Sequence, residues 1–190
     1  MKTRSKKHSR SINESGQASG FLAMTAIKPG EEDALRAVLE GWGDRGERPL
    51  DKVPGTHMAR FVIVKDFNNQ PHYKQRKEEH LAIPTLCFSS NFDGELDPYL
   101  DGLVKGLAKE APEIWGRCIG CPEDPNGLKA YLKHNQIDCG FFYAAYGEAT
   151  VGKVKASLDQ RERLMAFATR AQGMEPAELQ QAFLKEFASS

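Results

Sequence analysis

The fold is decided by an alternating stretch of nine residues, Thr56-His57-Met58-Ala59-Arg60-Phe61-Val62-Ile63-Val64. Its side chains alternate in character with the period of two that is typical of a β-strand. One face of that strand would carry His57, Ala59, Phe61 and Ile63, and the other Met58, Arg60, Val62 and Val64. The stretch is therefore predicted to be a strand that packs one face on a core.

Three further strands and two main helices are predicted around it. Strands are expected over residues 21–27, 81–90 and 139–146, and helices over about 31–42 and 96–107. The order strand–helix–strand–strand–helix–strand predicts an α+β, ferredoxin-like βαββαβ fold. Its four-stranded sheet would be antiparallel, with the helices on one face.

The remaining segments are predicted to be appendages. Residues 1–19 are basic and polar and are expected to be a disordered tail, 20–172 form the α+β domain, and 173–190 form a C-terminal helix. A long helix is also expected over 150–170 within the domain. The narrow apolar stripe of the C-terminal helix favours packing on a neighbouring element or on a second subunit.

Charge and composition exclude several classes of protein. The first ten residues carry five basic side chains and no acid, which leaves 21 basic and 26 acidic side chains in the other 180. An acidic body makes nucleic-acid binding unlikely, although the tail could act as a weak electrostatic anchor. Neither a membrane-spanning run nor a secretory signal is present, and the chain has four cysteines, so a cytoplasmic location is expected.

The third predicted strand ends in the sequence Ser89-Ser90-Asn91-Phe92-Asp93-Gly94. With the element order, this stretch resembles the ferredoxin-like, dimeric α/β-barrel superfamily, which includes haem-using dye-decolorising peroxidases and small monooxygenases. The peroxidases carry a Gly-x-x-Asp-Gly motif whose Asp lies over the haem. Asp93 and Gly94 match it, and Ser90 stands where the motif has Gly. The resemblance implies a homodimer, a small apolar or haem-like ligand, and a haem-dependent or cofactor-free oxidoreductase.

Asp93 and His57 are the candidate catalytic residues, and each has a second interpretation. A strand-end carboxylate over a cavity can move protons, but Asp-Gly is also a common turn dipeptide. A histidine can act as a base or bind a metal or haem iron, or it can be satisfied by one structural hydrogen bond. Arg60 could hold a carboxylate, but alternation places it opposite His57 unless a bulge intervenes.

The candidate ligand-binding residues are Arg60, Asn91, Phe141 and Tyr143. The aromatic side chains of 139–146 could line an apolar pocket against a dimer partner, or they could form core.

Four residues have a spacing that suggests zinc: Cys118, Cys121, His134 and Cys139. A redox Cys-x-x-Cys pair and a plain structural role are the alternatives to a zinc site. No phosphate-binding Gly-Lys-Ser/Thr loop or Gly-x-Ser-x-Gly elbow is present, which argues against P-loop nucleotide hydrolysis and the common serine hydrolases. The competing function is a non-catalytic assembly or interaction module.

Overall fold

The structure is a computed structural model that describes residues 12–67 and 80–188. It divides into two compact units, of which the first ends at Val151 and the second begins at Gly152. The sequence predicted this boundary near residue 172. The difference arises because the long C-terminal helix belongs with the last helix rather than with the sheet.

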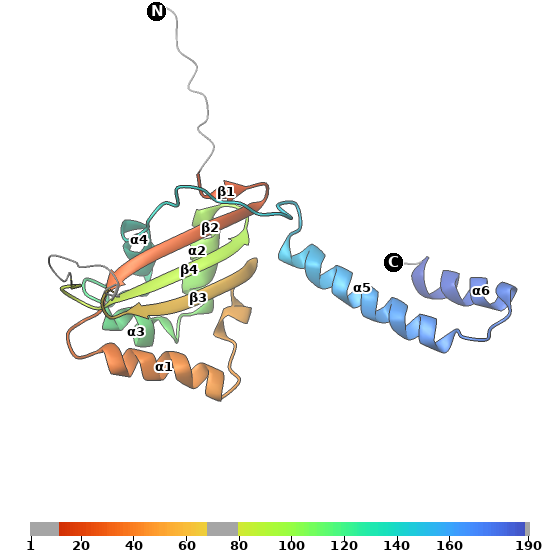
Figure 1. Ribbon diagram of the computed structural model, residues 1–190, viewed down its shortest axis with the longest axis horizontal. Coiled ribbons are helices and arrows are strands. Elements are labelled where there is room, and N and C mark those ends of the chain that lie inside the picture. Colours follow the sequence, from red (N-terminus) through yellow and green to blue (C-terminus); the bar gives the residue numbers. More distant parts are fainter. Residues whose placement is uncertain (1–11, 68–79, 189–190) are drawn as a thin grey trace, which may run out of the picture. The chain divides into compact units, whose positions relative to one another are not determined.

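The first unit contains a four-stranded antiparallel sheet with the order β1-β2-β4-β3 (Figure 1). The strands are β1 (Glu14–Ser15), β2 (Ala18–Ala26), β3 (Thr56–Val64) and β4 (Thr85–Asp93). Buried and more exposed residues alternate along β2 and β4, so that one face of the sheet lies on the core. The predicted α+β class with such a sheet is confirmed. Pro84 directly precedes the central strand β4, because a residue without an N–H cannot donate a hydrogen bond inside the sheet, and the strand predicted over 81–90 therefore begins at Thr85.

One face of the sheet is covered by the helices of the first unit. They are α1 (Glu32–Asp44), η1 (Pro49–Lys52), α2 (Leu96–Gly106), α3 (Ala111–Ile114), η2 (Trp115–Arg117) and α4 (Pro125–His134). Figure 1 shows α2, α3 and α4 behind the strands. Fully buried side chains from α1, α2 and η2, such as Leu35, Leu100 and Trp115, form one cluster with Phe88 and Phe92 of β4.

Aromatic rings form the centre of this core. Phe88 meets Trp115 edge to face with ring centroids 5.4 Å apart, and Phe61 lies 4.7 Å from Phe88. Phe92 stacks on Tyr99 of α2 at 3.8 Å. Such pairs contribute about 0.5–1.5 kcal/mol beyond the burial of their area, and they lock β4 to the helices.

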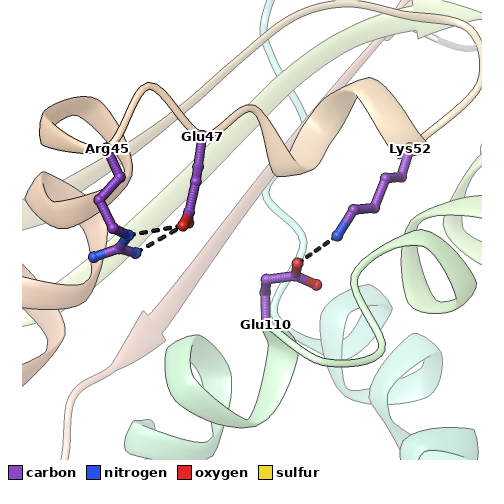
Figure 2. Close-up of polar contacts among 4 residues, drawn as sticks. All are labelled: Arg45, Glu47, Lys52 and Glu110. Atoms are coloured by element: carbon purple, nitrogen blue, oxygen red, sulfur yellow. Dashed lines mark hydrogen bonds and ion pairs between the residues drawn. The ribbon is translucent and has the colours of Figure 1, made fainter.

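Two ion pairs lie where α1, η1 and α3 approach one another (Figure 2). Lys52 Nζ of η1 lies 2.7 Å from Glu110 Oε1, at the residue that precedes α3. Arg45 follows α1, and its Nε lies 2.7 Å from Glu47 Oε1. The Glu110 side chain is mostly buried, whereas both members of the Arg45–Glu47 pair are exposed.

The second unit is a pair of helices, α5 (Val151–Arg170) and α6 (Pro176–Phe187), of which α5 begins at the last residue of the first unit. Phe167 of α5 packs against Phe183 and Phe187 of α6, with ring centroids 5.7 and 5.6 Å apart. Among the described residues of this unit, Phe167 and Ala171 are the buried hydrophobic ones.

Two predictions about the edges of the sheet are wrong. No strand forms over 139–146, and the fourth strand is instead β1, inside the stretch predicted to be a disordered tail. The physical reason is that the outer edge of β2 is already occupied. Gln136 bridges to Ala23, Ile137 N–H donates to Leu22 O, and β1 pairs with the beginning of β2. The rest of the predicted tail, residues 1–11, lies outside the described residues.

Candidate functional site

The face of the sheet opposite the helices carries an exposed, partly apolar surface. Alternation along the strands places these side chains there: Leu22, Met24, Met58, Arg60, Val62, Cys87, Ser89 and Asn91. Met58 is 68% exposed, although methionine is usually found in cores. We call these eight side chains the open face. Arg60 is the one cationic side chain among them, and its Nε donates to Ser89 Oγ at 3.0 Å.

A β-bulge at His57 interrupts the alternation of β3. Thr56 pairs with Phe92, and Met58 pairs with Asn91, the residue that precedes Phe92 in β4. His57 is therefore the extra residue. Thr56 Oγ1 lies 3.4 Å from the Tyr99 hydroxyl on the helix-covered face, whereas Met58 is on the open face. The prediction that His57 lies on the same face as Ala59 assumed strict alternation, which the bulge breaks. The bulge also allows the His57 ring to turn toward the end of β4.

Asp93, the last residue of β4, is held on three sides. Its Oδ1 lies 2.7 Å from His57 Nε2, and its Oδ2 accepts a 2.8 Å hydrogen bond from Val151 N–H at the start of α5. Its own N–H donates to Gly55 O at 3.0 Å. Gly55 has φ +77°, a conformation that favours glycine, and it precedes β3 directly. The His57 and Asp93 side chains are both partly buried.

This arrangement orients the imidazole. An ionised carboxylate can only accept hydrogen bonds, so the proton of the short contact sits on His57 Nε2. Nδ1 is then left as an acceptor, and it has no hydrogen-bond partner among the residues that the structure describes. A histidine whose ring is oriented by a carboxylate is the arrangement in which imidazole acts as a general base.

The contact between His57 and Asp93 does not fit haem. A haem iron takes its protein ligand on one side of the ring, and a proton-handling Asp of the peroxidase type lies over the other. The ring would have to separate the two side chains, yet their polar atoms are 2.7 Å apart. His57 as iron ligand and Asp93 over the same haem are therefore incompatible in one chain.

The other predicted ligand-binding residues are dispersed. The described contacts do not join Arg60 to the His57–Asp93 pair, and Asn91 lies on the open face opposite Met58 and Gly20. Phe141 and Tyr143 are 81% and 71% exposed. Neither lies in a core, and neither encloses a pocket within the described part of this chain.

Two residues near the site, Val151 and Phe142, make contacts that the sequence does not predict. Val151 lies at the start of a helix that the sequence predicts, and its N–H fixes the second oxygen of Asp93. Phe142, from the aromatic run, lies against Gly20 of β2. The signals were present in the sequence, a helix start and a glycine within a strand, but neither names its partner.

The four residues with zinc-like spacing do not gather. Among the described residues, no group of three or more His, Cys, Asp or Glu side chains is placed to hold a metal ion. Cys118 is buried and accepts a hydrogen bond from Thr25 Oγ1 at 3.3 Å, and burial raises the pKa of its thiol to about 11. Burial also raises the pKa of Cys121. Neither thiol is therefore prepared to react as a thiolate near neutral pH.

A separate cavity of ≈ 330 Å³ lies on the helical side of the first unit. Its wall includes Lys28, Val104, Ala111, Cys121 and Leu128. It is large enough for a small molecule, and neither His57 nor Asp93 contributes to it.

Within residues 12–67 and 80–188, no helix has the length and apolar character needed to cross a lipid bilayer. No family model, no curated protein and no solved structure matches this chain.

Proposed function

We propose that the first unit is a ferredoxin-like domain in which the last strand of that fold is reduced to a single bridge, and in which β1 is an additional short strand. The order β2-β4-β3, with α1 between β2 and β3 and α2 after β4, corresponds to the first three strands and two helices of that fold. In that fold the fourth strand lies beside the first. Here Gln136 makes an antiparallel bridge to Ala23 of β2, which supports the proposal.

We further propose that the protein binds a small apolar molecule on the open face and that His57 exchanges a proton with it. The observation that carries this proposal is the orientation of His57 by Asp93, whose other oxygen is fixed by Val151 N–H. Asp93 has both oxygens engaged, so it serves as a positioning residue, and His57 is the proton carrier. Peroxidase- or monooxygenase-like chemistry stays a prediction from the resemblance.

The open face supplies the binding surface in this proposal. Met24, Met58 and Val62 give an adaptable apolar contact, since methionine fits ligands of irregular shape. Arg60 can pair with an anionic group on the ligand. This division of labour agrees with the small number of polar groups that usually orient a ligand in an apolar site.

The binding step is tested by titration with 8-anilinonaphthalene-1-sulfonate, an apolar aromatic anion whose fluorescence rises on binding. We expect a saturable rise, and Met58→Lys should weaken the affinity about tenfold by placing a charge in the apolar contact. Ile119→Lys is the matched control, because Ile119 is also exposed but lies away from the open face. If both variants bind the dye with the affinity of the wild-type protein, binding at the open face is contradicted, and the ≈ 330 Å³ cavity becomes the site to test.

The proton-transfer step is tested by exchange of the methyl hydrogens of acetophenone in D₂O, followed by NMR. His57 Nδ1 would take one methyl proton and leave the enolate. The enolate then takes a deuteron from D₂O, and the imidazolium gives its proton to the deuteroxide that remains, which restores the base. A positioned base contributes about 10²–10⁴-fold, so His57→Gln should reduce exchange at least tenfold. Asp93→Asn should also reduce it, by loss of orientation.

His134→Gln is the control for nonspecific catalysis by a surface histidine. Exchange that is equal in the wild-type protein and in His57→Gln would sink the base role, whatever the dye titration shows.

A further inference from the structure

Helix α5 has an apolar stripe that none of the described residues of its own unit covers. Val154, Leu158 and Met165 recur at spacings of four and seven, which places them on one side of the helix. They are 41%, 52% and 56% exposed, because α6 packs on the opposite side of α5 through Phe167. We call Val154, Leu158 and Met165 the α5 stripe.

The size of the second unit makes this exposure costly. The unit has fewer than 40 residues, a size at which single cores usually need a disulfide, a metal or association for stability. On α6, Leu179, Phe183 and Leu184 are also exposed. An apolar groove of ≈ 570 Å³ between the two helices includes Leu164 and Phe183. The helix pair therefore exposes apolar side chains on α6 and along the groove as well as on the α5 stripe.

We propose that a second copy of this chain covers the α5 stripe, with the two α5 helices antiparallel. In the heptad pattern, Val154 and Leu158 occupy the seam positions d and a, Arg161 the next d, and Met165 the next a. An antiparallel pairing sets Val154 of one helix against Met165 of the other and Leu158 against Arg161, whose aliphatic stem can pack on it while the guanidinium reaches solvent. Two helix pairs joined in this way would form a four-helix arrangement.

Charge complementarity selects this partner and this orientation. Lys155 and Glu162 flank the stripe on the same side, seven residues apart, and both are exposed. Neither forms an ion pair within the residues that the structure describes. In the antiparallel pairing Lys155 of each copy faces Glu162 of the other, which gives two symmetric ion pairs. A parallel pairing sets Glu162 beside Ser157 and gives none.

The test is sedimentation equilibrium of the full chain. We expect a dimer that Lys155→Glu and Glu162→Lys each weaken about tenfold, since each change turns two attractive pairs into two repulsive ones. The double variant should restore the wild-type affinity to within about threefold. Circular dichroism of the three variants separates loss of association from loss of helix.

Disulfide trapping gives a second readout. In one chain, Val154→Cys and Met165→Cys would lie about 16 Å apart along the helix, too far to bridge. A disulfide between these positions can therefore form only between two copies. We expect a linked peptide joining residues 154 and 165 after oxidation, and Val154→Cys alone is the control for exchange with the native thiols.

A monomer at about 100 μM overturns the proposal, because an interface of this kind should hold at that concentration. So does a dimer that is unaffected by the charge reversals and yields no 154–165 link. Neither result bears on ligand binding at the open face, because the variants used here change residues of α5 and Met58→Lys changes a residue of β3. Failure here and failure of the ligand-binding proposal are thus distinguishable.

Discussion

The ring of Phe142 lies directly against Gly20, at the beginning of the sheet. A Cβ added to residue 20 would fall 2.9 Å from Phe142 Cε2, closer than side-chain atoms normally approach. Gly20 lies within β2 and faces the open side of the sheet, so Phe142 covers part of that face. The aromatic run 139–146 therefore makes a side-chain contact with the sheet without joining it as a strand.

Gly20→Ala should displace the Phe142 ring and loosen the segment that carries it. Overpacking of this kind costs about 1–3 kcal/mol when the neighbours cannot move. We expect faster chymotrypsin cleavage within 139–146 and a lower free energy of unfolding in urea. Gly43→Ala is the matched control, because a Cβ there meets nothing within 4 Å and lies in helix α1. That change should be neutral or stabilise by about 0.5–1 kcal/mol. Identical cleavage in Gly20→Ala and wild-type protein would contradict the contact.

Phe88→Ala should be among the most destabilising single changes in the first unit. Phe88 is fully buried and packs on the rings of Phe21, Phe61 and Trp115. Removing its ring leaves a cavity, and such changes cost about 3–5 kcal/mol. Urea denaturation followed by tryptophan fluorescence measures the loss. Phe141→Ala removes the same ring from an exposed position and should change stability by less than about 0.5 kcal/mol. Similar losses in both variants would mean that Phe88 is not at the centre of the core.

The two ion pairs of Figure 2 should differ in value. Burial raises the pKa of the Glu110 carboxyl, whereas the hydrogen bonds from Lys52 and from a backbone N–H lower it. The lowering is the larger effect, so the pKa lies below its ordinary value. Lys52→Met removes the cation from a mostly buried carboxylate whose Oε2 has no partner among the described residues. We expect a loss of about 1 kcal/mol, limited by the exposure of Lys52.

Arg45→Met serves as the comparison for that variant, since the Arg45–Glu47 pair is exposed on both sides. Exposed pairs contribute little because water screens them. Thermal unfolding near pH 7 should therefore show a lower midpoint for Lys52→Met and no measurable change for Arg45→Met. The reverse order would show that burial of Glu110 does not decide the outcome.

Asp66 should contribute stability that disappears only in strong acid. Hydrogen bonds from His80 and from the N–H groups of Leu81 and Phe67 lower the pKa of its carboxyl to about 2. A folded-state pKa below the unfolded value, about 3.9, gives a contribution that is complete above that value and lost as the pH falls toward 2. The difference in urea stability between wild-type protein and Asp66→Asn should follow this course from pH 6 to 2. A difference that is constant over this range would exclude ionisation of Asp66 as its source.

The sequence by itself determined the parts of this fold that depend on local pattern. Alternation located β3, a strand was predicted over most of β4, and apolar spacing located α1 and α2. It also singled out His57 and Asp93 as separate candidates. Their contact could not be predicted, because it depends on a bulge that shifts the register of β3 against β4 by one residue.

The tertiary structure alone decided what happens at the edge of the sheet. Residues 139–146 have the aromatic composition of a strand, and 14–19 do not, yet the second stretch is in the sheet and the first is not. A strand needs free backbone groups on a neighbour, and those of β2 are already bonded to β1, Gln136 and Ile137. Intrinsic propensity describes which segments can form a strand. Which segment joins the sheet depends on whether the edge of β2 is free, and the packing of the whole chain decides that.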